Sequence, residues 1–301
     1  MNNIFKLLTI LFVCILIQSC QKDVINNLDP VLPPTPLDSV IRLSKLIFID
    51  TKVSATDTTG YYVYIYDSLQ RVTSINIYDY KSVNRTIPAV ITYYYYGSNS
   101  VAYKKTGINP DPLEGYSDTA FYVYDDLNRL IKDSVRTSAA DSLINGTRVV
   151  VDQYNYSDTT ITAMTTSLNS ATPTVINMIA DTGFIGSTGD VIKTNEISNS
   201  LYYNIDSFTY DNKPNPFYQL NIRTTYHPVP GFLFLLEDFY LQRNNSTIIY
   251  ESYQTSPGNI VEITTTYTYT YNALDLPDTV NISDNNGPTD EPQIIFLYKK
   301  I

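Results

Sequence analysis

A nine-residue unit occurs twice in this chain and constrains its fold more than any other feature. Residues 64–72 read Tyr-Ile-Tyr-Asp-Ser-Leu-Gln-Arg-Val and align without gaps on residues 122–130, which read Tyr-Val-Tyr-Asp-Asp-Leu-Asn-Arg-Leu. The identical positions are Tyr64, Tyr66, Asp67, Leu69 and Arg71 in the first copy and Tyr122, Tyr124, Asp125, Leu127 and Arg129 in the second. Tyrosines two residues apart face one side of a strand, and aspartate favours a tight turn. The unit therefore predicts a β-hairpin.

Each position of the unit has an expected role. The aspartate should close the turn by accepting a hydrogen bond from a backbone N–H two residues later. Leu69 and Leu127 are expected to pin the turn to the core. The arginine should begin the second strand, with its guanidinium over a tyrosine ring or beside the turn aspartate. Less regular copies start at Phe208 and Tyr269, and shorter variants end at Gly97 and Ser157.

The unit resembles the YD repeat of the RHS and teneurin families, whose repeats are β-hairpins that build large curved sheets. Gln70 and Asn128 stand at the turn position where that repeat usually has glycine. The chain is also similar to small YD-like lipoproteins of Bacteroidota type, in which a late segment reads Tyr-Asp, Asn-Pro-Phe, an insert and Asn-Asn. That pattern occurs here at residues 210–211, 215–217 and 244–245. The resemblance implies a β fold on a surface lipoprotein and little about function.

Alternation predicts further strands. Between Ile263 and Tyr271 every second residue is threonine, which is typical of a half-buried antiparallel strand with its threonine face toward water. Strands are also expected at 149–156, 248–253 and 294–298. Tyrosine is abundant, at 28 residues, and tyrosine and threonine favour strands. We therefore expect an all-β fold, an antiparallel meander of hairpins that forms a large curved sheet or a partly closed barrel or sandwich.

One segment departs from this pattern. After Pro230 and Gly231, apolar residues at 232, 235, 236 and 239 follow helical spacing. This spacing predicts a short helix over 232–242 that plugs one open end or face of the sheet, with an apolar loop as the alternative.

The N-terminus predicts export and lipid attachment. An apolar run from Leu7 to Ile17 is too short to span a bilayer and has the length of the apolar part of a signal peptide. The run ends in Ile-Gln-Ser-Cys at residues 17–20, which resembles the bacterial lipobox. We expect a removed signal peptide at 1–19, lipid on Cys20, a proline-rich tether over 20–45 and a single β domain over 46–301. The alternative is an ordinary signal peptide followed by an incidental cysteine.

Charge limits the partners. Removal of Lys6 with the signal peptide takes the formal net charge from −10 to −11. Such a surface repels nucleic acid and anionic lipid, so the expected contact with the membrane is the N-terminal lipid alone. We expect an outer-membrane lipoprotein on the cell surface that acts as a binding or scaffold module for an unidentified glycan or protein.

Two other interpretations stay open. A glycan-active hydrolase would need only two carboxylates, and the 30 acidic residues offer many pairs. A membrane-embedded β-barrel would need an apolar outer face, and the threonine face of residues 263–271 argues against it.

The sequence lacks the residues of most catalytic sites. His227 is the only histidine, and the two cysteines, Cys14 and Cys20, lie in the signal peptide and at the lipid site. Zinc sites of histidine and cysteine and cysteine nucleophiles are therefore excluded, and no cofactor motif is present. We expect no enzyme activity. Asp284 and Asp290 are the candidates for a calcium site, although hairpin turns favour the same residues.

A modification pattern is frequent in the chain. Asp followed by Ser or Thr and then Ala, Ile, Leu, Val, Met or Thr resembles the O-glycosylation acceptor of exported Bacteroidota proteins. The acceptor positions are Ser39, Thr58, Ser68, Thr119, Ser134, Ser142, Thr159 and Thr279. Composition alone would give about two such sites, so the pattern predicts several attached sugars.

Overall fold

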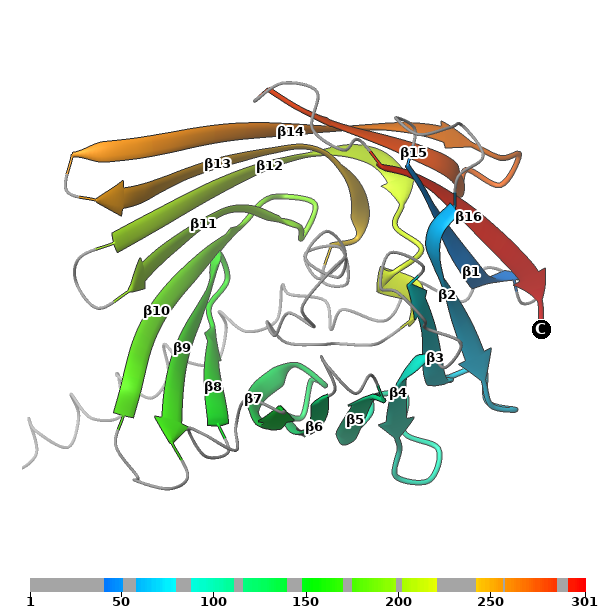
Figure 1. Ribbon diagram of the computed structural model, residues 1–301, viewed down its shortest axis with the longest axis horizontal. Coiled ribbons are helices and arrows are strands. Elements are labelled where there is room, and N and C mark those ends of the chain that lie inside the picture. The colour runs from blue at the N-terminus through cyan, green and yellow to red at the C-terminus, as the bar shows by residue number, and fades with distance from the viewer. Residues whose placement is uncertain are drawn as a thin grey trace, which may run out of the picture. The chain divides into compact units, whose positions relative to one another are not determined.

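The computed structural model describes residues 41–50, 58–79, 88–110, 116–139, 148–169, 175–198, 202–220, 242–256, 258–285 and 292–301. These residues belong to the unit Pro36–Ile301. They form sixteen antiparallel strands that close into a barrel (Figure 1). Each strand pairs with its neighbours in the sequence, and β1 pairs with β16 to complete the ring.

The strands are β1 (Ile41–Asp50), β2 (Thr58–Tyr66), β3 (Val72–Asp79), β4 (Ala89–Tyr94), β5 (Lys104–Asn109), β6 (Tyr116–Tyr124), β7 (Leu130–Ala139), β8 (Arg148–Tyr156), β9 (Thr160–Asn169), β10 (Val175–Ile185), β11 (Val191–Ser198), β12 (Tyr202–Pro214), β13 (Asn244–Ser256), β14 (Asn259–Tyr271), β15 (Pro277–Asp284) and β16 (Pro292–Lys300). A short 3-10 helix, η1 (Tyr218–Leu220), follows β12.

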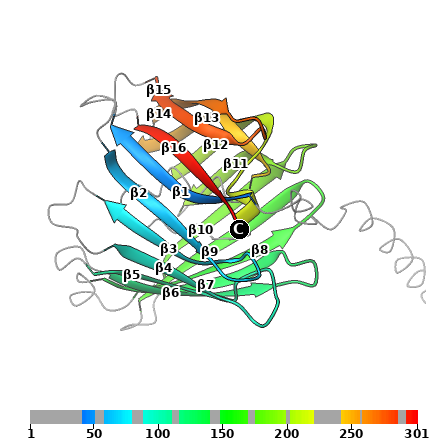
Figure 2. The same cartoon turned by 90° about the vertical axis from the view of Figure 1, so that its right-hand side faces the viewer.

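The antiparallel order gives the barrel two rims, and the second view shows the strands running between them (Figure 2). One rim holds the connections that follow the even-numbered strands, together with the start of β1 and the end of β16; we call it the turn rim. The other holds the connections that follow the odd-numbered strands; we call it the loop rim.

The hairpin prediction is confirmed, and the prediction of an open sheet, partly closed barrel or sandwich is wrong. The expected strands at 149–156, 248–253, 263–271 and 294–298 lie in β8, β13, β14 and β16. Closure depends on the register between β1 and β16, in which Ile41 lies opposite Lys300 and Asp50 opposite Pro292. Local hairpin signals carry no information about a pairing between the two ends of a domain.

The predicted helix over 232–242 is not part of this fold as described. Among its residues only Gln242 is described, and Gln242 is not helical. The remainder of that segment lies outside the described residues. In the described part of the chain, no helix is long and apolar enough to cross a membrane.

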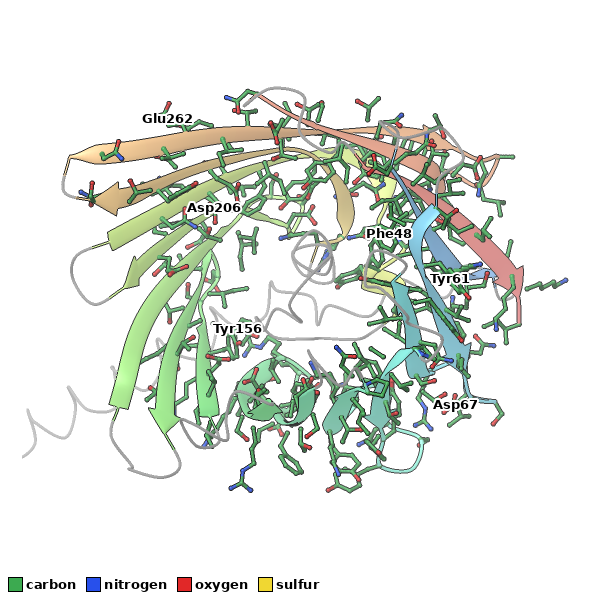
Figure 3. The ribbon with its side chains drawn as sticks, in the orientation of Figure 1. Phe48, Tyr61, Asp67, Tyr156, Asp206 and Glu262 are labelled. Carbon is green, nitrogen blue, oxygen red and sulfur yellow. The ribbon has the colours of Figure 1, made fainter. Side chains whose placement is uncertain are left out.

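Side chains alternate between an inner and an outer face of the barrel wall. Figure 3 shows Phe48, Tyr156 and Asp206 on the inner side, and Tyr61 and Glu262 on the outer side. In β14, Tyr267 is buried whereas Thr268 and Thr270 are exposed, as the alternation predicts. The main apolar cluster lines the inner face and includes Leu46, Phe48, Tyr62, Tyr64, Ile75, Ile91, Phe208, Ile249, Tyr267, Val280, Ile294 and Phe296.

Candidate functional site

The two Tyr-Asp units form the same turn at the turn rim. The Oδ1 atom of Asp67 accepts hydrogen bonds from the backbone amides of Leu69 and Arg71 at 2.9 and 3.0 Å, and Oδ2 accepts one from Arg71 Nε at 2.8 Å. Asp125 repeats these contacts with its own leucine and arginine. Gln70 has a φ of 63°, in the left-handed region that favours glycine.

A third copy of this turn lies between β14 and β15. The Oδ1 atom of Asn272 accepts hydrogen bonds from the amides of Leu274 and Leu276, and Asp275 has a φ of 59°. Asparagine thus replaces the turn aspartate without changing the backbone. The copy at Phe208 differs, because β12 continues through Tyr210 to Pro214.

The expected role of the turn leucines is wrong, because Leu69 and Leu127 are 53% and 40% exposed. Leu274, at the same position of the third turn, is 45% exposed. The carboxylate and amide contacts close these turns without help from the leucine. The arginine role is confirmed, since Arg71 lies 4.4 Å from the ring centre of Tyr95 and Arg129 lies 4.8 Å from that of Tyr156.

Tyrosine hydroxyls tie neighbouring strands together along the turn rim. Six of them donate to backbone carbonyl oxygens: Tyr66 to Leu43, Tyr95 to Val72, Tyr124 to Ala102, Tyr156 to Leu130, Tyr210 to Val191 and Tyr298 to Pro277. Five of the acceptors, all except Ala102, lie beside a β-bulge. A bulge disrupts the ladder locally, and the hydroxyl satisfies a carbonyl there. The repeated tyrosines are therefore structural.

The Asn-Pro-Phe and Asn-Asn segments, together with Asp190, form a buried polar network at the same rim. Asp190 is fully buried and accepts hydrogen bonds from the amides of Arg243 and Asn244, from Asn244 Nδ2 and from Thr188 Oγ1. Asn215 donates from Nδ2 to the carbonyl oxygen of Gln242 at 2.8 Å. These contacts hold the end of β12 and the start of β13 against the β10–β11 turn.

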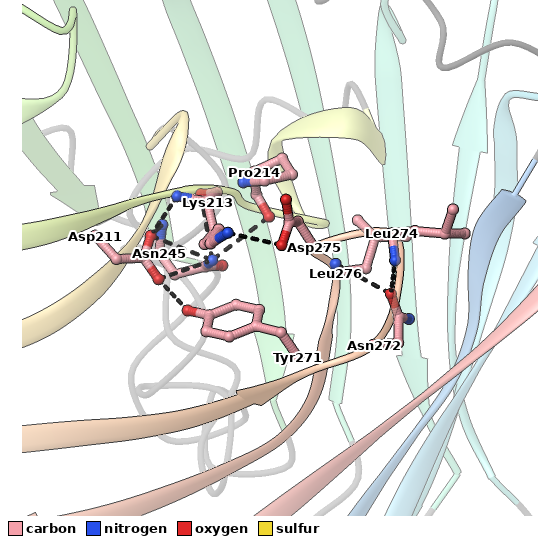
Figure 4. Close-up of polar contacts among 9 residues, drawn as sticks. All are labelled: Asp211, Lys213, Pro214, Asn245, Tyr271, Asn272, Leu274, Asp275 and Leu276. Carbon is pink, nitrogen blue, oxygen red and sulfur yellow. Dashed lines mark hydrogen bonds and ion pairs between the residues drawn. The ribbon is translucent and has the colours of Figure 1, made fainter.

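Asp211 is the second centre of this network (Figure 4). Its carboxylate accepts hydrogen bonds from the amides of Lys213 and Asn245 and from the hydroxyl of Tyr271. Lys213 in turn forms an ion pair of 2.6 Å with Asp275 in the third Tyr-Asp turn. The network is saturated with partners, so it is a structural joint and not a ligand site.

A different set of carboxylates lies on the inner face of β11, β12 and β13. Asp206 lies directly opposite Glu251 in the register of β12 and β13, and Glu196 occupies the neighbouring position on β11. Thr194 and Asn204 donate to Asp206 Oδ2 at 2.9 and 3.4 Å. The buried Oδ1 atoms of Asp206 and Asn204 have no hydrogen-bond partner. We call Glu196, Asn204, Asp206 and Glu251 the inner acidic patch.

The electrostatics of the inner acidic patch are unfavourable. Burial raises the pKa of Glu196 and of Glu251, and the charge of Asp206 raises both further. Burial also raises the pKa of Asp206, against the two hydrogen bonds that lower it. A positive charge or a set of hydrogen-bond donors would relieve both the repulsion and the unsatisfied acceptors.

More buried carboxylates line β6, β7 and β8. Asp133 and Asp152 lie opposite each other and are almost fully buried, and Asp118 forms an ion pair of 3.7 Å with Lys105. Burial raises the pKa of Tyr122, and the nearby charges of Asp133 and Asp118 raise it further. Among the described residues, no group of histidine, cysteine, aspartate and glutamate side chains could hold a metal ion.

The predicted modification and calcium positions are dispersed over the barrel. Ser68 and Thr159 are exposed in connections of the turn rim, whereas Thr58, Thr119, Ser134 and Thr279 are half-buried on strands. Asp284 is half-buried in β15. Cys20, Ser39, Ser142 and Asp290 lie outside the described residues. Asp67, which precedes Ser68, closes a turn, so some Asp-Ser dipeptides have a structural cause.

Two solved structures are similar to the barrel. A porin-like protein from Bacteroides vulgatus ATCC 8482 has a TM-score of 0.55 and 10% identity, and the match covers 88% of this chain and 100% of that chain. A porin-like protein from Bacteroides uniformis ATCC 8492 has a TM-score of 0.48 and 14% identity over 85% and 98%. No family model and no curated protein sequence matches. The first likeness shows the barrel fold alone.

Proposed function

We propose that the chain is an outer-membrane lipoprotein whose barrel stands in water beside the membrane and binds a ligand on its inner face. The observation that carries this proposal is the polarity of the wall. A barrel embedded in lipid is apolar outside and polar inside. Here the main apolar cluster lines the inner face, and the outer face carries exposed charged and polar residues such as Lys132, Arg136, Glu262 and Thr268 among exposed apolar ones such as Ile65, Phe121 and Met164.

The inner acidic patch is the proposed ligand site. Its unsatisfied atoms, Oδ1 of Asp206 and of Asn204, are acceptors, so the ligand must donate hydrogen bonds. Three neighbouring carboxylates favour a cation over a neutral donor. Phe208 and Ile249, farther along the inner faces of β12 and β13, belong to the apolar cluster and provide a surface for an apolar group. The site therefore fits an amphipathic cation.

A pair of probes with the same apolar tail tests this assignment. Octylammonium and octyl glucoside differ in the head group, one a cation and the other a neutral polyol. We expect octylammonium to raise the Tm of the wild-type barrel and to lose most of this effect in Asp206→Asn. The matched control is Asp158→Asn, an exposed aspartate on the turn rim. A stronger effect of octyl glucoside would favour a glycan ligand, and no effect of either would reject the site.

The membrane anchor is tested separately. Cys20→Ala should release the protein from the membrane fraction, because the lipid is the proposed attachment. Protein that remains with membranes after a carbonate wash would contradict lipid anchoring without bearing on the inner acidic patch.

The hydrolase interpretation receives no support from the comparisons or from the described residues. Asp206 and Glu251 are paired across strands, but no feature distinguishes an acid from a base, since burial raises the pKa of both. A general acid and its partner carboxylate need environments that separate their pKa values.

A further inference from the structure

We propose that the turn rim of the barrel rests on the lipid surface, with Leu69, Leu127 and Leu274 inserted among the head groups. This inference rests in part on the proposed lipid anchor. It concerns a surface that the anchor alone does not require, since a tethered barrel could stand free of the membrane in any orientation.

The three leucines occupy one position of one repeated turn. Each follows a turn aspartate or asparagine by two residues and precedes a residue with positive φ at 70, 128 or 275. The turn is closed by the side chain of Asp67, Asp125 or Asn272 and by backbone hydrogen bonds, so the leucine has no part in its geometry. The three exposed leucines lie at the tips of turns that follow β2, β6 and β14, four or eight strands apart around the rim, and provide three separate apolar contact points at one end of the barrel.

Lysines lie near the same rim. Apart from the inward-facing Lys105 and from Lys45, which lies in the middle of β1, six described lysines lie within two residues of a strand end at the turn rim: Lys104, Lys132, Lys193, Lys213, Lys299 and Lys300. Three of the described lysines lie beside aromatic rings, with Lys45 Nζ 3.8 Å from the ring centre of Tyr61, Lys104 Nζ 4.9 Å from that of Tyr94, and Lys299 Nζ 5.3 Å from that of Tyr66. Lysines and aromatic rings beside apolar side chains suit a membrane interface.

The charge distribution along the described strands is uneven. The chain carries a net charge of −10, yet most of its described lysines lie near one rim. The turn carboxylates Asp67, Asp125 and Asp275 are neutralised there by ion pairs. The rim carries both positive and negative charges, because it also exposes Asp126, Asp158 and Asp278. Insertion of the apolar side chains must therefore supply much of the affinity for the lipid surface.

The connection to the proposed anchor places this rim near the lipid. β1 begins at Ile41 on the turn rim, 21 residues after Cys20. A tether of that length spans at most about 70 Å when fully extended. It therefore keeps the rim at a high effective concentration at the lipid surface, where weak insertion of three leucines suffices for docking. The loop rim then faces away from the membrane.

The chain has no tryptophan, so single tryptophans can report the position of each rim. We would place Leu69→Trp, Leu127→Trp and Leu274→Trp one at a time in the lipidated chain. Each variant is reconstituted in phosphatidylethanolamine and phosphatidylglycerol vesicles (3:1) with brominated acyl chains, which quench only tryptophans in contact with them. Ile108→Trp and Ile260→Trp are matched controls, because both isoleucines are exposed at loop-rim ends of strands.

We expect at least about twofold quenching at the three turn positions and none at the two controls. Equal quenching at both rims, or none at the turn rim, would overturn the docking proposal. Shielding of the turn-rim tryptophans from iodide in native membranes but not in vesicles would overturn it in favour of a protein partner. Failure of the lipid anchor would be seen earlier, as protein that does not float with the vesicles, and is distinguishable from failure of docking.

Discussion

The turn rim and the inner acidic patch use carboxylates in opposite ways. At the rim, Asp67 and Asp125 each accept two backbone amides and an arginine. Burial is the largest single influence and raises their pKa, but the hydrogen bonds from the amide and side chain of the arginine, its charge and the leucine amide together lower it more, so the net shift is downward. In the patch, Asp206 is crowded by Glu251 and Glu196, and the pKa of all three is raised.

This difference separates architecture from function. Carboxylates with every acceptor filled stabilise a fold, whereas buried carboxylates that repel one another reduce its stability and mark a place where a ligand can compensate. The rim contacts recur in three turns, as expected for a structural device. The patch occurs once, on three adjacent strands.

The largest expected effect is at the rim. Asp190→Ala removes the acceptor of four hydrogen bonds at a fully buried position and leaves the amides of Arg243 and Asn244 unsatisfied. We expect a loss of about 3–5 kcal/mol in the free energy of unfolding, measured by urea denaturation. Asp158→Ala, at an exposed position, should change it by less than about 0.5 kcal/mol. If the two substitutions had similar effects, the hydrogen bonds of Asp190 would not stabilise the fold as proposed.

The turns themselves give the next effect. Asp125→Ala should cost about 1–3 kcal/mol because two backbone amides and Arg129 lose their acceptor. Leu127→Ala should cost no more than about 0.5 kcal/mol, since the side chain is exposed. Because the pKa of Asp125 is lowered in the fold, the contribution of this carboxylate is present above its unfolded pKa and is lost as the pH falls through the folded value. A large loss of unfolding free energy in Leu127→Ala would show that this leucine packs in the core after all.

The tyrosine hydroxyls should contribute less individually. Tyr95→Phe leaves the carbonyl oxygen of Val72 without its hydrogen bond and should destabilise the barrel by about 1–2 kcal/mol. Tyr96→Phe, at a neighbouring exposed position, is the control and should be neutral. The difference in urea midpoint between these variants measures the hydroxyl bond, and its absence would contradict the structural role of the repeated tyrosines.

Substitution in the inner acidic patch should stabilise the barrel, in contrast to the substitutions at the turn rim. Asp206→Asn removes a charge that burial disfavours and that raises the pKa of Glu196 and Glu251, so the barrel should gain about 2–4 °C in Tm at neutral pH, the shift caused by about 1 kcal/mol in a domain of this size. A carboxyl whose folded pKa is raised costs stability above that pKa, so the gain should shrink as the pH falls toward the ordinary carboxyl range. A loss of stability at neutral pH would mean that the patch belongs with the saturated carboxylates of the rim.

Local sequence information predicted the parts of this fold that depend on neighbouring residues. The spacing of Tyr64 and Tyr66, the turn aspartate and the alternation of residues 263–271 each specify a strand or a hairpin directly. Closure of the barrel depends on Ile41 meeting Lys300, and no local rule encodes that pairing. The exposure of Leu69 was mispredicted for a related reason, since the carboxylate of Asp67 already closes the turn.

The inner acidic patch could not be found without the register. Glu196, Asp206 and Glu251 are ordinary acidic residues in the sequence, and they meet only because β11, β12 and β13 pair in one particular alignment. The sequence did contain one weak indication of the patch. Asp206 alternates with Phe208 and Tyr210 and therefore lies on the same inner face, where an apolar residue is usual. The Asn-Pro-Phe and Asn-Asn segments stood out in the sequence only through a resemblance, and their joint role around Asp190 depends on the β10–β11 turn.

Folding in water without detergent tests the central claim most directly, which is that the barrel keeps its main apolar cluster on the inner face and needs no lipid around its outer face. The unit Pro36–Ile301, produced without a signal peptide or lipid, should be monodisperse in detergent-free buffer by size-exclusion chromatography with light scattering. It should also unfold in a single cooperative transition. Aggregation in buffer with recovery of a β-barrel signature only in detergent micelles would show that the outer face needs lipid, and would contradict this account.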